Sequence, residues 1–225
     1  MIEHLRVSAA HVFVPDLAAP VVAPDDHRHL AKVLRLRDGE TVSCSDGAGS
    51  WRLCTWGNSD LEPVSDVTTE PSPSPTLTVA VSPVKGDRTD MVVEKLVEIG
   101  IDSIVLLAPV ERSVVRWAPD KVEHVLSRYR RIVRAAAMQS RRVFLPAVSG
   151  PVALDSVLDG SAAVAEPGGS APWGSVTTVV IGPEGGFTDR EIAGAALTVD
   201  LGPHVLRAET AALVAASRMV AHWRR

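Results

Sequence analysis

Cysteine is scarce in this chain of 225 residues, where it occurs only at Cys44 and Cys54. Two cysteines are too few for a disulfide scaffold, and they lack the Cys/His spacing of a structural zinc site. We interpret both as buried thiols, with a cross-strand disulfide between them as the alternative. The sequence predicts no metal centre.

Long apolar runs are also missing, because no uninterrupted stretch approaches the roughly 18 residues that a membrane span needs. The N-terminus lacks the basic region followed by an apolar region that marks a signal peptide. Apolar residues make up 46% of the chain and charged residues 22%, which excludes disordered, collagen-like and coiled-coil classes. We therefore expect a cytoplasmic globular protein that has no membrane partner.

The chain has no overall excess of positive charge, since its formal net charge is −4. An acidic protein does not bind nucleic acid through bulk charge alone. Residues 112–142 differ from the rest, with nine basic and two acidic side chains. A solvated helix face is the ordinary explanation for such a segment, but this density of positive charge favours an RNA contact.

A stretch rich in proline and serine, within residues 68–76, divides the chain. We predict a small β-rich domain over 1–70, a linker over 71–76 and a larger domain over 77–225. In the first domain, alternating apolar residues and helical spacing predict four strands and one helix. The strands are 11–14, 41–45, 51–56 and 61–67, and the helix is 25–36.

In the second domain, predicted strands and helices alternate, which is typical of an α/β fold with a parallel sheet covered by helices. The predicted strands are 77–81, 104–107, 143–145, 162–165, 176–181 and 199–201. The predicted helices are 90–99, 119–136, 154–158, 188–197 and 211–223. Thr188 and Glu191 form the capping box that opens the fourth helix.

The motifs of phosphate-loop NTPases, dinucleotide-binding enzymes and serine hydrolases of the nucleophile-elbow type are all absent. Two glycine-containing loops, at residues 181–187 and 201–210, follow predicted strands instead. Open α/β sheets bind ligands in loops beyond the carboxyl ends of their strands. Gly185 and Gly186 let a ligand approach the main chain, although a pair of tight turns is the simpler interpretation. The pattern favours a ligand held by main-chain and apolar contacts.

Seven short sequence motifs follow one another along the chain. They are Lys85-Gly86, residues 94–100, residues 111–113, Gln139-Ser140 with Arg142 and Pro146, residues 181–187, Leu201-Gly202 and residues 205–211. Together they resemble the RsmE family of ribosomal RNA small subunit methyltransferases, in the SPOUT superfamily. The resemblance runs from His29 to the last helix, and the combination of Gly-Pro-Glu-Gly-Gly with Leu-Arg-Ala-Glu-Thr-Ala is its most specific part. Met138 and Arg141 stand where the family usually has Glu and Gly.

The resemblance implies a PUA-like β-barrel followed by a SPOUT domain, whose mostly parallel sheet carries a deep trefoil knot. It implies a homodimer that uses S-adenosyl-L-methionine as methyl donor. The implied acceptor is N3 of the uridine at conventional position 1498 in 16S rRNA, within the small ribosomal subunit. Two other functions stay open: a SPOUT methyltransferase acting on the ribose 2′-hydroxyl of tRNA, and an RNA-binding or ribosome-assembly protein without catalysis.

The same resemblance implies the residues of the site. The donor would be held by Glu166, Gly182, Pro183, Glu184, Gly185, Gly186, Leu201, Gly202, Leu206, Thr210 and Ala211. Arg207 is our candidate for stabilising the uridine anion, and Glu209 is either the base or the carboxylate that orients Arg207. RNA contacts are expected from Arg28, Lys32, Arg35, Lys85, Arg112, Arg116, Arg131, Arg134, Gln139 and Arg142.

Overall fold

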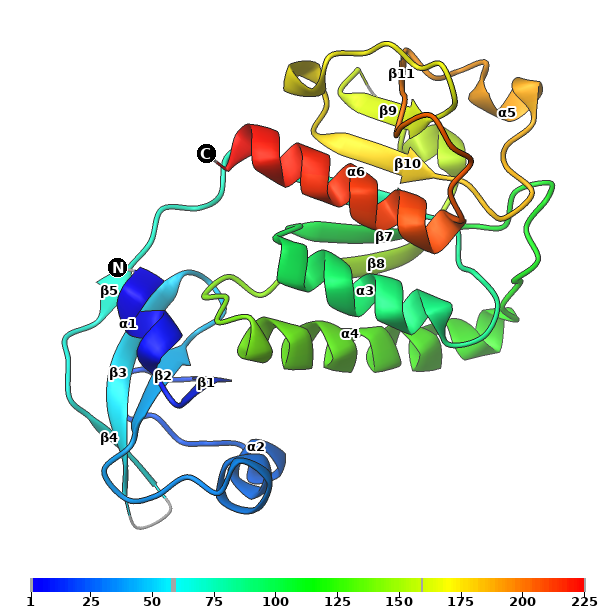
Figure 1. Ribbon diagram of the computed structural model, residues 1–225. Helices are drawn as coiled ribbons and strands as arrows, with labels where there is room; N and C mark the ends of the chain where they lie inside the picture. Colours follow the sequence, from blue (N-terminus) through cyan, green and yellow to red (C-terminus); the bar gives the residue numbers. More distant parts are fainter. Residues whose placement is uncertain (1, 58–59, 159, 225) are drawn as a thin grey trace. The chain divides into compact units, whose positions relative to one another are not determined.

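The computed structural model describes residues 2–57, 60–158 and 160–224, and the chain forms two compact units (Figure 1). The first unit comprises Met1–Ser72 and Ala137–Leu145, and the second comprises Pro73–Ala136 and Pro146–Arg225. Residues 137–145 therefore belong with the first unit, although they lie within the range predicted for the second domain. Within the described part of the chain, each helix is too short or too polar to cross a lipid bilayer.

The first unit is built on a five-stranded sheet in which β1 pairs with β2 in parallel and the remaining pairs are antiparallel. Its strands are β1 (Ala10–Phe13), β2 (Thr41–Ser45), β3 (Ser50–Gly57), β4 (Asp60–Pro63) and β5 (Thr68–Thr69). The core includes Val12, Val42 and Trp56. Alternation along the strands turns these side chains inward, as the sequence pattern predicts.

Two short helices and a π-helix complete the first unit: α1 (Ile2–Val7), α2 (Pro24–Arg28) and η1 (His29–Leu34). The predicted helix over 25–36 is therefore an α-helical turn that continues as a π-helix. It ends earlier than predicted because Arg35 adopts a left-handed conformation, with φ of 54°. The predicted strand over 61–67 is also wrong in part, since β4 ends at Pro63, where a proline cannot donate to the ladder.

The predicted strand over 143–145 is wrong, because this segment makes only one isolated bridge, between Phe144 and Ala48. Val143 instead packs with Leu5 and Trp51 in a small apolar cluster of the first unit. The main-chain N–H of Gly49 donates to the carbonyl of Val143. These contacts join residues far apart in the chain, so residues 143–145 pack within the first unit although they form no strand.

Cys44 and Cys54 are free, buried thiols on neighbouring strands of the first unit, which confirms the first interpretation. Their sulfur atoms lie 3.4 Å apart. The hydrogen bond to Cys54, together with burial, raises the pKa of the Cys44 thiol. Cys44 is therefore held as a neutral thiol in the core.

The second unit is an α/β fold with a fully parallel six-stranded sheet, which confirms the predicted class. The strand order is β11-β9-β10-β6-β7-β8. The strands are β6 (Thr78–Val81), β7 (Ser103–Leu107), β8 (Ala147–Val152), β9 (Ala162–Ala165), β10 (Thr178–Ile181) and β11 (Leu197–Val199). Because the strands are parallel, their carboxyl ends lie at one edge.

Among the described residues, four α-helices accompany this sheet: α3 (Arg88–Ile99), α4 (Val122–Gln139), α5 (Asp189–Ile192) and α6 (Ala208–Trp223). Short 3₁₀ turns occur at η2 (Pro119–Lys121), η3 (Leu154–Ser156) and η4 (Trp173–Ser175). Figure 1 shows α6 and α3 side by side, and α6 also packs against β6 and β10. A separate cluster that includes Ala80, Val180 and Phe187 is covered by residues of η3 and α5.

The predicted helix over 188–197 is wrong beyond its first turn. Thr188 and Glu191 do form the capping box, but α5 ends at Ile192. Residues 197–199 then pair with β9 as the edge strand β11, so the strand predicted over 199–201 is shifted. The β-branched residues Thr198 and Val199 suit a strand, and the edge of β9 gives them a partner that local spacing does not show.

Candidate active site

A cavity of about 550 Å³ lies in the second unit, beyond the carboxyl ends of β9, β10 and β11. Two loops form most of its wall: the glycine loop (residues 182–187) and the second loop (residues 200–207). Its volume falls within the range of ordinary small-molecule sites. The lining residues are Arg112, Ala165, Glu166, Pro167, Ile181, Gly182, Pro183, Glu184, Gly185, Gly186, Phe187, Asp200, Leu201, Gly202, His204, Val205, Leu206, Arg207, Ala208 and Ala211.

The cavity brings together all but one of the residues that the resemblance assigned to the donor, and Arg207 with them. The exception is Thr210, which lines a different hollow on α6 together with Leu213 and Ser217. Successive residues of an α-helix point about 100° apart, so Thr210 cannot share the direction of Ala211. Glu209 is likewise not among the described residues that line the cavity.

Two glycines of these loops have backbone conformations that favour glycine. Gly186 has φ of 69° and Gly202 has φ of 132°. A β-carbon is strained in this region of backbone space, whereas glycine adopts it freely. The turns at these positions shape the two loops that line the cavity.

Asp200 stabilises the second loop, and the sequence analysis did not select it. Its carboxylate accepts hydrogen bonds from the backbone N–H groups of Gly202 at 2.5 Å and of Gly168 at 2.7 Å. These two bonds hold the pKa of the carboxyl below its ordinary value. The guanidinium of Arg218 donates to the carbonyls of Asp200 and Leu201. The signal was present in the sequence, since Asp two residues before Gly is typical of an Asx turn.

Arg112 has a role in this cavity that its assignment to RNA did not anticipate. Its guanidinium donates to the carbonyl of Gly185 at 2.9 Å and to that of Phe187 at 3.3 Å. A β-carbon at Gly185 would lie 3.1 Å from that of Arg112. Arg112 therefore holds the main chain of the glycine loop.

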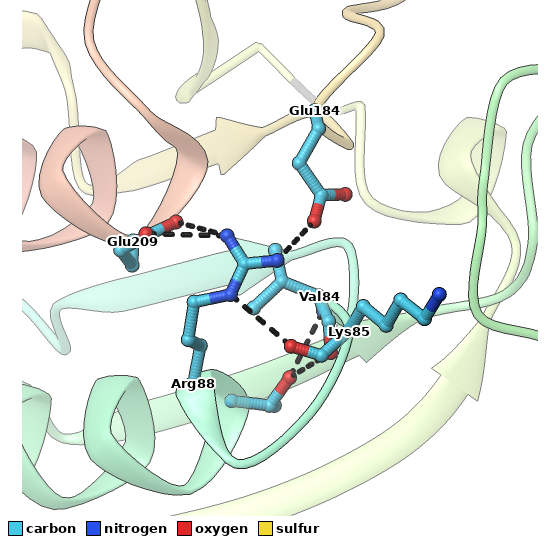
Figure 2. Close-up of polar contacts among 6 residues, drawn as sticks. Val84, Lys85, Arg88, Glu184 and Glu209 are labelled. Carbon is cyan, nitrogen blue, oxygen red and sulfur yellow. Dashed lines mark hydrogen bonds and ion pairs between the residues drawn. The ribbon is translucent and has the colours of Figure 1, made fainter.

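Arg88, the first residue of α3, lies between two carboxylates (Figure 2). One terminal nitrogen of its guanidinium donates to Glu184 of the glycine loop at 2.9 Å. The other donates to both carboxylate oxygens of Glu209, at 3.3 and 3.4 Å. Nε donates to the carbonyl of Lys85 at 3.1 Å. Sequence reasoning missed Arg88, because its partners are remote in the chain.

Glu209 thus has Arg88 as its hydrogen-bonded partner, while the positive charge of Arg207 acts on it from nearby. Its side chain is only 10% exposed. The backbone N–H of Glu209 itself, and then Arg88 and Arg207, hold the pKa of this carboxyl below its ordinary value in spite of burial. Glu209 is therefore ionised near neutral pH and is a weak proton acceptor there.

We expect Glu209→Gln to lower the free energy of unfolding by about 1 kcal/mol at pH 7, because a charge-assisted hydrogen bond in a mostly buried position is weakened. The folded state lowers the pKa of Glu209, so its carboxylate stabilises the fold above the ordinary pKa near 4.5. That stabilisation is lost as the pH falls through the folded pKa. Urea unfolding of both proteins between pH 7 and pH 3.5 should show the difference shrinking, and a constant difference would contradict the ionised assignment.

Glu166 differs from Glu209 in its electrostatics. It follows β9 directly and lines the cavity with a half-buried side chain. Burial raises the pKa of this carboxyl, and the nearby charge of Asp189 raises it further. Acidic groups with raised pKa values are characteristic of ligand sites, which supports a role for this wall in binding.

The residues assigned to RNA are divided between the two units. The first unit contains Arg28, Lys32, Arg35, Gln139 and Arg142, and the second contains Lys85, Arg112, Arg116, Arg131 and Arg134. Most are exposed, whereas Arg134 and Arg142 are half-buried. Arg116 donates to the carbonyls of Val110 and Glu111, and Arg28 pairs with Asp25.

The two positions that depart from the family strings are accommodated in the first unit. Met138 packs against its apolar core. Arg141 has φ of 61°, the conformation that favours the glycine usual in the family. Its guanidinium donates to the carbonyls of Ser8, Ala9 and Met138. These bonds offset the backbone strain.

Among the described residues, no group of three or more His, Cys, Asp or Glu side chains is placed to hold a metal ion. What the cavity offers is main-chain groups of two glycine-containing loops, apolar side chains and the charges of Glu166 and Arg207. Such a site suits an organic ligand with polar and apolar parts.

Comparison with known families assigns the class of this protein. A family described as an RNA methyltransferase domain matches residues 70–220, and one described as an RNA methyltransferase PUA domain matches residues 23–55. The chain is therefore an RNA methyltransferase that combines an α/β domain with a PUA-like domain.

The particular family follows from relatives that match most of the chain, and the protein belongs to the ribosomal RNA small subunit methyltransferase E family. The Mycobacterium tuberculosis enzyme of that name is 34% identical over 228 residues, covering 90% of this chain and 86% of the relative. The Bacillus subtilis enzyme of the same name is 26% identical and covers 87% of each chain.

A solved structure from Legionella pneumophila, in complex with the bound cofactor SAM, resembles this chain closely in fold. Its TM-score is 0.79 at 27% sequence identity, and the match covers 94% of this chain and 97% of that one. The resemblance noted from the sequence strings is thus confirmed, because family, fold and relatives agree.

Proposed function

We propose that this protein transfers a methyl group from S-adenosyl-L-methionine to N3 of the uridine at conventional position 1498 in 16S rRNA. The proposal rests on the cavity that the glycine loop and the second loop line, with Arg207 on its wall. Membership of the small subunit methyltransferase E family supports the substrate, and the Legionella structure with bound SAM supports the donor.

The residues of the cavity fit this donor. The volume of about 550 Å³ accommodates a ligand of its size, and the glycine loop exposes main-chain groups that suit an adenine ring. Leu201, Leu206 and Ala211 supply apolar contacts, while Glu166 supplies a negative charge for the donor's ammonium group. S-adenosyl-L-methionine supplies the methyl group when it is bound.

The chain's own residues then position the acceptor and stabilise its charge. The protonated imide nitrogen of uridine has no available lone pair, so N3 must release its proton to water in order to accept the methyl group. Arg207 is the N-cap residue of α6 and lines the cavity, so its positive charge and the positive end of the helix dipole both lie on the cavity wall. Both stabilise an anion that forms in the cavity.

The finer features of the fold and assembly belong to this proposal as well. We propose that the loops around the cavity form the trefoil knot of the SPOUT superfamily and that the PUA-like domain forms a β-barrel. The hollow on α6 that includes Leu213 and Val214 supports a homodimer, because such a face is typically covered in an assembly. The protein would act in the cytoplasm on the small ribosomal subunit.

The basic residues contribute RNA affinity through phosphate contacts, and Arg131 is an exposed example on α4. We expect Arg131→Gln to weaken RNA binding severalfold at low salt, with a smaller effect at high salt, because fewer counterions are released. Titration of fluorescent rRNA fragments from about 50 to 300 mM salt measures this difference. An unchanged salt dependence would remove Arg131 from the interface.

The proposed function is tested by transfer of labelled methyl from S-adenosyl-L-methionine to small ribosomal subunits that lack the modification, in parallel with protein-free 16S rRNA. Nucleoside mass spectrometry then identifies the product. Appearance of 3-methyluridine supports the proposal, and comparison of particle with free RNA shows which is recognised. Donor binding without a methylated base directs the search to the ribose of tRNA. Absence of donor binding would leave an RNA-binding or ribosome-assembly protein.

A further inference from the structure

We propose that Arg88 is a positioning residue for the glycine loop, which it joins through Glu184 to Glu209 of α6. The inference rests on the proposed function, because the loop is taken to hold the methyl donor. It assigns Glu209 the part of an anchor for Arg88, in place of a general base or a partner for Arg207.

The geometry of Arg88 supports a bridge between three segments. The guanidinium contacts the loop before α3 through Lys85, the glycine loop through Glu184 and helix α6 through Glu209 (Figure 2). A guanidinium is planar and its donors have fixed directions, so three such contacts fix its orientation. The contact with Glu184, at 2.9 Å, is the shortest of them.

The start of α3, from which Arg88 projects, is itself held in place. The hydroxyl of Thr89 accepts a hydrogen bond from the N–H of Val84 at 2.9 Å and donates to the carbonyl of Val84 at 3.1 Å. Thr89 is buried. The bridge therefore starts from a rigid base, and a shift of Glu184 would have to break its contact with Arg88.

The bridge supports the cavity wall from outside the cavity. Glu184 lines the cavity, whereas neither Arg88 nor Glu209 is among the described residues that line it. Arg112 holds the same loop through the carbonyls of Gly185 and Phe187. One arginine thus fixes the loop's main chain and the other fixes its acidic side chain, so Arg88 acts on a ligand only through the loop.

This restraint matters because of the composition of the loop. Gly182, Gly185 and Gly186 have large conformational freedom, and a loose loop must lose that freedom when it binds a ligand. A loop that is already ordered avoids this loss and binds more tightly. Without Arg88, the carboxylates of Glu184 and Glu209 would also lose the cation between them, which favours movement of Glu184 away from α6.

The experiment measures the dissociation constant of S-adenosyl-L-methionine by isothermal titration calorimetry, with a thermal melt of each variant as a check of folding. We expect Arg88→Met to weaken donor binding about tenfold, the equivalent of one charge-assisted hydrogen bond. Arg88→Lys should restore part of the affinity, because an ammonium keeps the charge but lacks the planar fork. Glu184→Gln should weaken binding in the same way.

The double variant Arg88→Met with Glu184→Gln distinguishes a single contact between the two residues from two independent effects on donor affinity. If the two residues act through one contact, the double variant binds the donor about as well as Arg88→Met alone, so the effects are not additive. Lys95→Met is the matched control, because Lys95 also lies on α3 and pairs with two carboxylates, Glu94 and Glu98. Its donor affinity should equal that of the unmodified protein.

Three different results would overturn the inference. If the unmodified protein binds the donor and Arg88→Met binds it within twofold, Arg88 has no positioning role, whatever the melting temperature does. Additive effects of the two substitutions would likewise exclude the bridge. If the unmodified protein binds no donor, the proposed function fails and the inference fails with it.

Discussion

Arg207→Ala is expected to reduce the rate of methylation about a thousandfold, while the affinity for the methyl donor changes no more than a few-fold. Removing a single preorganised group that stabilises a developing anion typically costs about 10²–10³ in rate, and a full positive charge lies at the upper end of that range. Arg207 lines the cavity at the N-terminus of α6, where it would face the acceptor. The contacts of the glycine loop with Arg88 and Arg112 are not altered by this substitution.

Single-turnover kinetics with saturating donor measure the chemical step, and calorimetry measures donor affinity separately. Arg190→Ala is a suitable control, because Arg190 is exposed on α5 and is not among the described residues of the cavity wall. The control should methylate normally. Normal turnover by Arg207→Ala would remove this residue from the mechanism, and a large loss of donor affinity would make it a binding residue instead.

Gly150→Ala is expected to lower the free energy of unfolding of the second unit by about 3 kcal/mol or more, through backbone strain and a steric clash in the sheet. Gly150 lies in β8 with φ of 130°. A β-carbon at this position would lie 2.4 Å from the carbonyl oxygen of Leu106 in the neighbouring strand β7. That oxygen belongs to the backbone, so the strand would have to move.

Denaturant unfolding followed by circular dichroism measures this loss. Gly86→Ala is the matched control, because Gly86 also has positive φ, of 78°, but no atom lies within 4 Å of a β-carbon placed there. The control should lose only about 1 kcal/mol, the cost of the backbone conformation. Equal losses in the two variants would show that the contact with Leu106 relaxes at little cost.

The fold class was accessible from the sequence because its signals are local. Strands rich in Val and Ile alternate with amphipathic helices after residue 76, and the structure contains the parallel sheet that this pattern predicts. The capping box at Thr188 was equally readable, since both of its partners lie within one turn. The length of α5 could not be predicted from the sequence, because Leu197–Val199 forms a strand only beside the edge of β9.

The assignment of residues 137–145 also shows that local sequence patterns do not reveal contacts between distant segments. The apolar residues Val143 and Phe144 follow a long helix, so an alternating pattern predicted one more strand of the second domain. In the structure they pack with Leu5 and Trp51, more than 90 residues earlier in the chain. Such contacts depend on which surfaces meet after the elements have formed, and spacing within a short window does not contain that information.

For the site, the sequence by itself predicted the two glycine-containing loops and, through family strings, proposed donor residues that line one cavity, apart from Thr210. Local sequence is enough to predict these loops, because a glycine that allows positive φ and a loop that follows a parallel strand can both be recognised from a few neighbouring residues. Tertiary structure alone decided the partners of Arg88 and Arg112 near the cavity. Arg88 meets Glu184 and Glu209, and Arg112 meets Gly185, only because the ends of parallel strands converge at one edge of the sheet.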